Sequence, residues 1–507
     1  MKQHLLLISM LCCSLLSWGQ RATVCGYVTD KESGERLIGA TVYDTISQIG
    51  TVTNTAGFYS LTLPQGNHAL QASYVGYNAG KVRALVLKND TTISIRISSS
   101  TSLDEVVVVG THKAVSGPES VQMSAVEIPV SQIKGIPAIG GEVDVLKAIQ
   151  LLPGVQSGSE GSAGMYVRGG GPDENLMILD GVPLYNVNHL MGFFSVFNAD
   201  AIKNVTLYKG NFPAQYGGRL SSIIDVRQND GNTESYHGNI TVGLLAAKFN
   251  LEGPIPHKKD STGTTTFNIS ARRTYFDAFL APIMASRMAG TGGTMTAGVY
   301  FYDVNAKLSH TFANQKDKLS ASFYMGDDAI YLSTGQKSKS KEQEIKESMG
   351  LHMNWGNILA AANWEHQYNA RLFSNAQLSY TRYRYKLTQD MEESVKAPNP
   401  EDNSHYEQTM RYNSSLQDVS AKMQFEWTPL HNNTLHFGAE YAYHQFRPEV
   451  SNYYQKDTTS RMDTTYTDGK LHGHEVVIYA EDQWSPWRWL KLNVGLRGSL
   501  YAIDGKV

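Results

Sequence analysis

The chain has 507 residues, which is more than one ordinary domain needs. Charged residues make up 18% of it and apolar residues 41%, with 45 Gly and 28 Tyr. The charged share lies below the roughly 25% that is usual for soluble domains, and the net charge of −3 leaves no basic surface for nucleic acid. After Arg21 no apolar run approaches the roughly 18 residues of a spanning helix, which excludes a helical membrane protein but not a transmembrane β-barrel.

The N-terminus is typical of an export signal. A basic start precedes an apolar run from Leu5 to Leu16, and small residues follow as far as Gly19. This pattern predicts a signal peptide over residues 1–19. Cys12 and Cys13 would leave with it, so Cys25 has no partner for an internal disulfide and is predicted to be a small buried apolar residue in a strand.

Residues 21–100 are expected to form a small β-sandwich. Short β-type runs at 24–28, 40–43, 57–63 and 68–74 are separated by turn residues at regular intervals. The segments Leu37-Ile38-Gly39-Ala40-Thr41-Val42, Thr53-Asn54-Thr55-Ala56-Gly57-Phe58-Tyr59 and Tyr74-Val75-Gly76-Tyr77 resemble the carboxypeptidase regulatory-like domain. The resemblance does not imply peptidase chemistry, and no His-Glu-x-x-His zinc motif occurs in this region.

A linker over residues 101–115 contains a candidate docking strand. Its four consecutive valines have high β-propensity, and its members are Asp104, Glu105, Val106, Val107, Val108 and Val109. One interpretation is the last strand of the sandwich. The other, which the resemblance described next favours, is a peptide that adds itself as a strand to a partner's sheet.

Residues 116–232 carry five motifs in a fixed order. A short helix over 145–152 is stopped by Pro153-Gly154, and Leu179-Asp180-Gly181-Val182 is a two-residue hairpin signal. The remaining motifs are Tyr166-Val167-Arg168-Gly169-Gly170, Ala201 to Gly210, and Tyr216-Gly217-Gly218-Arg219-Leu220 with the strand after it. Together they resemble the plug domain of TonB-dependent outer-membrane receptors of the Bacteroidetes type. The glycines between 158 and 171 do not form a phosphate-binding motif and are expected to be a surface loop.

Residues 234–507 are expected to form barrel hairpins. Ten segments alternate apolar and polar residues, centred on 240–252, 265–276, 304–309, 318–327, 355–366, 371–386, 419–427, 435–444, 474–484 and 490–497. Short connections near 254–264, 313–317, 367–370, 428–432 and 485–489 alternate with long ones near 277–300, 328–352, 387–414 and 447–472. Unequal loops and aromatic residues at strand ends favour an outer-membrane barrel over a soluble sandwich.

The fold class is therefore expected to be mainly β. It combines an N-terminal β-sandwich, an α+β plug and a partial antiparallel transmembrane barrel with about ten of an expected 22 strands. Ten strands would enclose a radius of about 10 Å, whereas a plug of about 115 residues has a radius of about 17 Å. Twenty-two strands, the number in the family's barrel, reach about 22 Å. The sequence is therefore expected to be an N-terminal fragment.

The resemblance implies active import of a scarce nutrient across the outer membrane of a Gram-negative bacterium, with the sandwich and plug on the periplasmic side. TonB, powered through ExbB and ExbD, would capture residues 104–109 and displace the plug. The implied ligand is a siderophore, glycan, peptide or cobalamin, and neither a cofactor nor catalytic residues are expected. A surface lipoprotein partner stays open, although Leu152-Pro153-Gly154-Val155 differs from the form found in the branch that has one. The alternative is an adhesion or signalling receptor that does not transport.

The resemblance also suggests site residues. Arg168 and Arg219 match plug positions that the family uses to lock plug to wall, and Glu440 and Glu481 are their expected partners on the barrel.

Ligand contacts are expected from the residues that follow the 180–181 hairpin, with packing against the barrel wall as the alternative. They are Tyr185, Asn186, His189 and Phe193.

Overall fold

In the computed structural model, residues 20–100, 125–136, 141–158, 164–256, 263–288, 291–467, 469–487 and 489–504 are described. The predicted signal peptide and the candidate docking strand at 104–109 lie outside these residues. Within them, no helix is long and apolar enough to cross a membrane.

The N-terminal domain is a sandwich of two four-stranded sheets. One sheet has the order β4-β1-β7, with β8 also paired to β1, and the other has the order β3-β2-β5-β6. Their inward side chains, such as Val24, Leu61 and Leu70, form one apolar core. The strands are β1 (Arg21–Asp30), β2 (Thr41–Asp44), β3 (Ile49–Val52), β4 (Phe58–Pro64), β5 (Gly66–Ser73), β6 (Arg83–Leu87), β7 (Thr91–Thr92) and β8 (Ile95–Ile97). The predicted sandwich and the burial of Cys25 in β1 are confirmed.

The plug is built on a five-stranded sheet of order β13-β12-β17-β16-β9. The predicted helix is α3, whose first turn is capped by the Asp144 side chain accepting a hydrogen bond from the Lys147 backbone N at 3.0 Å. The elements are β9 (Ala125–Pro129), α2 (Val130–Ile133), α3 (Val145–Gln150), β10 (Val155–Ser157), β11 (Met165–Val167), η1 (Pro172–Glu174), β12 (Asn175–Leu179), β13 (Val182–Pro183), β14 (Asn188–His189), η2 (Leu190–Gly192), β15 (Phe194–Ser195), β16 (Ile202–Tyr208) and β17 (Ser222–Gln228).

The predicted hairpin joins β12 to β13. Asp180 and Gly181 adopt φ values of 47° and 84°, and Leu179 pairs with Val182 across the turn. Two consecutive positive φ values are the type I′ geometry that an Asp-Gly pair favours. The apolar residues on either side of the turn are buried in the plug core.

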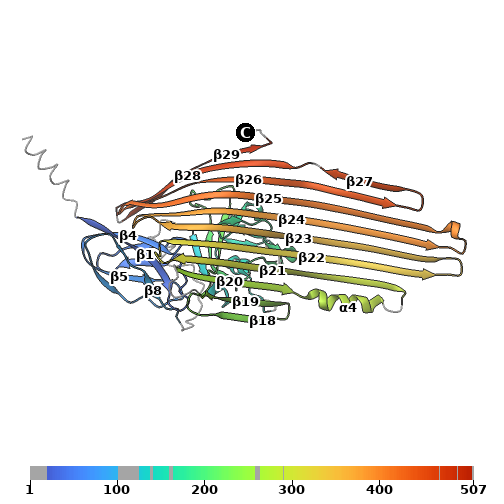
Figure 1. The fold of residues 1–507 in the computed structure, drawn as a ribbon, viewed down its shortest axis with the longest axis horizontal. Coiled ribbons are helices and arrows are strands. Elements are labelled where there is room, and N and C mark those ends of the chain that lie inside the picture. The colour runs from blue at the N-terminus through green and yellow to red at the C-terminus, as the bar shows by residue number, and fades with distance from the viewer. Residues whose placement is uncertain are drawn as a thin grey trace, which may run out of the picture.

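The third part is one antiparallel sheet of twelve strands, whose edge strands in the described region are β18 and β29. Its elements are β18 (His237–Val242), β19 (Ala246–Ile255), β20 (Gly263–Thr274), α4 (Phe276–Met288), β21 (Gly293–Phe312), β22 (Asp317–Lys339), β23 (Glu344–Gln367), β24 (Leu372–Lys396), η3 (Pro400–Asp402), β25 (Ser404–Leu430), β26 (Asn433–Lys456), β27 (Arg461–Thr467), β28 (Leu471–Trp487) and β29 (Leu490–Ile503). The sandwich lies at the end of the sheet that carries the turns at 313–316, 368–371 and 431–432, which we call the short-turn end, and the long strands run out to the opposite end (Figure 1).

The structure corrects the strand count and the long loops. The segment 240–252 is two strands, β18 and β19, and β27 is a further strand beside β26. Most residues expected in long loops instead extend β22 to β26, which reach 23 to 27 residues each. The outward face of β24 changes from Leu378 and Tyr380 to Arg382 and Arg384, so this face is no longer apolar while the strand pairing continues.

Candidate functional site

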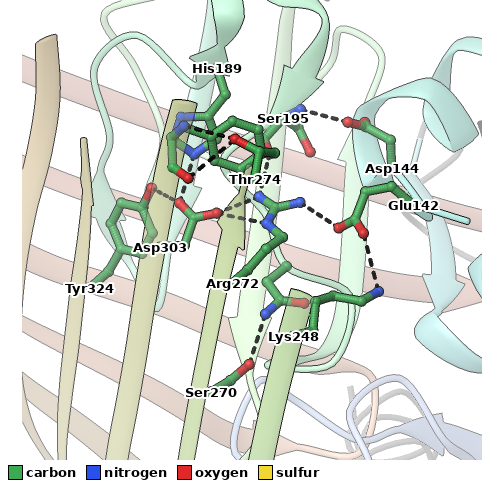
Figure 2. A network of polar contacts seen from close by, with 12 residues as sticks. Glu142, Asp144, His189, Ser195, Lys248, Ser270, Arg272, Thr274, Asp303 and Tyr324 are labelled. Carbon is green, nitrogen blue, oxygen red and sulfur yellow. Dashed lines mark hydrogen bonds and ion pairs between the residues drawn. The ribbon is translucent and has the colours of Figure 1, made fainter. Parts of the chain in front are cut away.

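The plug lies against one face of the barrel sheet, and a buried charged network joins the two (Figure 2). Arg272 on β20 is its centre and is 1% exposed. Its Nη1 donates to Glu142 Oε1 of the plug at 3.0 Å, its Nη2 to the Ser195 carbonyl of the plug at 2.8 Å, and its Nε to Asp303 Oδ2 of β21 at 2.8 Å. One barrel side chain therefore donates hydrogen bonds to acceptors in two separate plug segments while it also pairs with a carboxylate on the neighbouring strand.

Strand pairing explains why this arrangement forms locally. Arg272 and Asp303 are directly opposed in the β20–β21 register, so both side chains point to the plug side of the sheet. Tyr324, two strands along, donates its hydroxyl to Asp303 Oδ1 at 2.8 Å and is buried against the plug core. Neighbouring barrel strands therefore present a row of inward polar groups to the plug.

His189, at the end of β14, is the plug's counterpart to Arg272. Its Nε2 lies 2.6 Å from Asp303 Oδ1 and its Nδ1 lies 2.6 Å from Asp328 Oδ2 of β22. The imidazole stacks on the Phe301 ring with the centroids 4.1 Å apart. Burial lowers the pKa of His189, but the two carboxylates outweigh burial and raise the pKa to about 9. His189 is therefore a cation at neutral pH, held between two barrel carboxylates.

A second charged cluster lies toward the sandwich. Lys307 of β21 contacts Asp180 Oδ2 at 3.2 Å and Asp230 Oδ1 at 3.0 Å. Asp230 also pairs with Lys203 at 2.7 Å and with Lys318 of β22 at 2.9 Å. Burial opposes ionisation of Asp230, but the three lysines outweigh it and hold the pKa of this carboxyl well below its usual range.

The expected ligand residues divide into wall contacts and exposed groups. Tyr185 donates its hydroxyl to Asp418 of β25, and Asn186 Nδ2 donates to the Tyr383 hydroxyl at 3.2 Å. Phe193 is 41% exposed. His189 departs from the expectation, because both of its ring nitrogens are occupied by barrel carboxylates and its side chain is buried. Its contacts correspond to the alternative of packing against the wall.

The expected lock does not form between the residues proposed for it. Arg168 and Arg219 are exposed, and among the described residues neither contacts Glu440 or Glu481. Glu440 instead pairs with its barrel neighbour Lys422 at 3.4 Å.

Glu481 does meet the plug, but through the main chain. It accepts a hydrogen bond from the Ala214 backbone N, and Arg497 of β29 donates to the Gln215 carbonyl at 2.8 Å. The arginine at this contact therefore comes from the wall rather than from the plug.

Sequence reasoning missed the residues that carry most of the interface, namely Arg272, Asp303, Asp328, Lys307 and Asp418. All of them occupy inward positions of barrel strands. A charged side chain that is buried is costly unless it is paired, so these inward charges were a usable signal. In the described ranges no three His, Cys, Asp or Glu side chains are arranged to hold a metal ion.

Comparisons with known proteins agree with this architecture. The profile of the CarboxypepD_reg-like domain matches residues 24–108, and that of the TonB-dependent Receptor Plug Domain matches residues 120–222. TonB-dependent receptor SusC of Bacteroides thetaiotaomicron is 26% identical over 275 residues, which cover 49% of this chain and 26% of SusC. A TonB-dependent receptor of Formosa agariphila is 30% identical over 204 residues, covering 38% of this chain and 19% of that protein. The matches therefore span about a quarter or less of these relatives.

Two solved structures of receptors are among those similar to this one. The ferric yersiniabactin uptake receptor FyuA of Yersinia pestis is 12% identical, with a TM-score of 0.33 and coverage of 75% of this chain and 69% of FyuA. The siderophore receptor PirA of Pseudomonas aeruginosa is 12% identical, with a TM-score of 0.29 and coverage of 75% and 90%.

The sequence matches identify two consecutive domains, and the structure adds the sheet against which the second of them lies. The chain is therefore similar to the TonB-dependent receptors: a carboxypeptidase regulatory-like domain and a plug domain are followed by one antiparallel sheet of twelve strands.

Proposed function

We propose that this protein is a bacterial outer-membrane receptor that imports a scarce nutrient, with TonB, ExbB and ExbD supplying the force that displaces the plug. The observation that carries the proposal is the polar character of the contact between plug and wall. Buried ion pairs and hydrogen bonds anchor the plug through Arg272, His189 and Lys307. Such an interface favours one position of the plug against the wall. When the plug is moved, water can form hydrogen bonds to the groups that lose their protein partners.

The position of the plug's hairpin region favours ligand binding on the side away from the sandwich. Tyr185 and Asn186 contact Asp418 and Tyr383, which lie about eleven residues along their strands from the short turns at residues 368–371 and 431–432. β24 and β25 continue beyond this level. The exposed ring of Phe193, close to this region in sequence, offers a stacking surface for a sugar ring, a peptide or an aromatic chelator.

A periplasmic capture strand completes the mechanism. Residues 104–109 combine two acids with four valines, a composition suited to β-augmentation of a TonB sheet. Their position between the sandwich and the plug would let a pull on them reach the plug directly. No covalent step on the nutrient is involved.

The test uses the complete receptor gene in its own bacterium. A knockout is first grown on single iron sources and single carbon sources to find the nutrient that it fails to use. Complementation with a gene that lacks codons 104–109, or that carries Val107→Pro, is expected to leave that growth defect while cells still bind the nutrient. Proline removes a main-chain donor and its ring obstructs strand pairing. Val107→Thr keeps the shape and the donor, and is expected to restore growth.

The adhesion or signalling alternative makes a different prediction. A knockout that binds less of a surface ligand but grows normally on every single source would contradict import. Normal growth of the Val107→Pro strain on the identified nutrient would contradict TonB capture at this strand.

A further inference from the structure

The N-terminal sandwich is packed against the barrel at the short-turn end of the sheet. The Phe58 ring of the sandwich stacks on the Phe373 ring of β24, with the centroids 5.3 Å apart. Ser60 Oγ donates to the Ala370 carbonyl at 2.8 Å, and Arg371 Nε donates to Thr23 Oγ1 at 2.9 Å. The turn between β23 and β24 is therefore seated on the sandwich by both apolar and polar contacts.

Charged groups extend this docking surface. Arg36 of the sandwich lies over the Tyr27 ring at 3.7 Å and pairs with Glu365 of β23 at 3.2 Å. Asn54 Nδ2 donates to Glu426 of β25 at 2.9 Å. The Arg36 and Glu365 side chains are only 9% and 16% exposed, so undocking would leave both charges without their main partner.

The sandwich also contacts the plug. Gly39, with a φ of 72°, lies so close to Glu127 of β9 that a Cβ there would sit 1.7 Å from the Glu127 carboxylate. The same carboxylate accepts hydrogen bonds from Tyr74 of the sandwich at 3.4 Å and from Asn204 of the plug at 2.7 Å. The bare backbone at Gly39 is thus what lets the two domains approach this closely.

One cluster of charges, which we call the junction cluster, joins all three parts of the molecule. Glu35 of the sandwich accepts a hydrogen bond from the Asp230 backbone N at 2.8 Å and lies 3.3 Å from Lys203 Nζ. Lys203 and Asp230 lead to Lys307 and Lys318 on the barrel, and Lys307 leads to Asp180. Its members are Glu35, Asp180, Lys203, Asp230, Lys307 and Lys318.

The charge balance of the junction cluster depends on the sandwich. Three lysines face three carboxylates when Glu35 is present, and three lysines face two when it is removed. Excess charge in a buried cluster is costly. Docking of the sandwich therefore stabilises the seated plug, and a seated plug stabilises the docked sandwich to the same extent.

We propose that the N-terminal sandwich is an intramolecular latch, which joins the plug to the barrel wall through Glu35 when docked and must undock before the plug can leave. The sandwich is thereby assigned a binding partner, namely the turn-side rim of this chain's own barrel and plug. Release of either domain weakens the hold on the other.

Cys25 provides a native reporter of undocking. It is 1% exposed, belongs to the apolar cluster that contains Phe58 and Phe373, and its Sγ lies 3.2 Å from Gln367 Nε2 of the barrel. Burial raises the pKa of the Cys25 thiol, so a docked sandwich holds little of the reactive thiolate. The rate of N-ethylmaleimide addition to the peptide that contains Cys25, followed by mass spectrometry on the purified complete receptor, measures how often the sandwich opens.

Two substitutions on different domains should both accelerate this labelling. Glu35→Gln removes the charge that the sandwich contributes to the junction cluster, and Lys318→Met removes a barrel lysine that pairs with Asp230. Each is expected to raise the rate about tenfold, and the double variant, with two lysines and two carboxylates, is expected to label more slowly than the product of the single effects predicts. Lys337→Met is the matched control, since Lys337 lies at the far end of the same strand and pairs with Glu344.

Three results would overturn the latch. They are wild-type labelling as fast as in urea, single variants that label at the wild-type rate, and a double variant whose effects simply multiply. If Lys318→Met fails to fold, the protein would lose the heat-dependent shift in gel mobility that folded barrels show. Glu35→Gln keeps the side-chain shape, so it still tests the effect of the charge. The assay needs neither ligand nor TonB, so its failure would leave the proposed import standing, and failure of import would leave the latch standing.

Discussion

At the scale of single residues, the seating of the plug depends on a few buried charges. Arg272→Met should leave Glu142 and Asp303 without their main partner, because both face the guanidinium in a buried site. Removing one member of a buried ion pair costs roughly 3–5 kcal/mol. The expected result is a loss of that size in the free energy of plug unfolding, measured by hydrogen exchange of the β16 amides in urea.

The next residue along the chain supplies the control. Arg273 points to the other face of β20, and its side chain is 50% exposed in an ion pair with Asp277. Arg273→Met should change the same free energy by less than about 1 kcal/mol, since exposed pairs contribute little. Equal losses in the two variants would show that Arg272 does not anchor the plug.

At the scale of the strands, only part of each long strand is expected to lie in lipid. About ten residues of a tilted strand cross a bilayer, whereas β25 has 27 residues. Ala421 of β25 lines an outward apolar hollow of about 770 Å³, and Thr409, on the same face, donates to Asp390 at 2.9 Å. Ala421→Arg is expected to cost about 2–4 kcal/mol of barrel stability in lipid vesicles.

Thr409→Arg is the matched change beyond the membrane. Water and the Asp390 carboxylate can solvate the new guanidinium there, so the expected cost is near zero. Urea unfolding of the barrel in vesicles measures both variants. A similar cost at the two positions would contradict the placement of the bilayer at the short-turn half of the strands.

At the scale of the whole molecule, seating of the plug should depend on pH through His189. The pKa of His189 is raised from 6.5 to about 9 by the barrel carboxylates. Protonation therefore stabilises the seated plug fully below pH 6.5, and this stabilisation is lost as the pH rises through about 9. The expected loss is roughly 3 kcal/mol, read from the urea midpoint of plug unfolding at each pH.

His189→Gln removes the titrating group and leaves the surrounding carboxylates in place. Its plug should be less stable than the wild-type plug at pH 6.5, and its stability should vary less between pH 6.5 and pH 9.5. A wild-type midpoint that stays constant across this range would refute the role of His189 as a cation between Asp303 and Asp328.

Several features were predictable because neighbouring residues decide them. The Asp180-Gly181 turn needs two positive φ values, and α3 begins after its Asp144 cap and ends at Gln150, ahead of Pro153. Strand alternation could be read wherever one face of the sheet is apolar or packs against the plug core. The same criterion failed beyond residue 386, where a long loop was expected but cross-strand hydrogen bonding continues β24 and β25.

The partners of the charges could not be predicted in this way. Arg168 and Arg219 stand in recognisable plug motifs, yet the contacts at the wall come from Glu481 and Arg497. Many inward charges are available along the strands, and which of them meets the plug depends on how far the plug sits along the wall. That distance is set by packing of the whole plug core against Tyr324 and its neighbours.

The amino-acid sequence by itself determined the order of the domains, the plug's local turns and the β character of the barrel, because these follow from short-range propensity and from apolar periodicity. Only the tertiary structure decided how long the strands run, which buried charges pair between plug and wall, and that the sandwich is docked on both. The strand lengths depend on backbone pairing between neighbouring strands, and interdomain contacts such as those of Arg272 with Glu142 and of Glu35 with Asp230 join residues more than a hundred positions apart, so the pattern of side chains along one segment specifies neither.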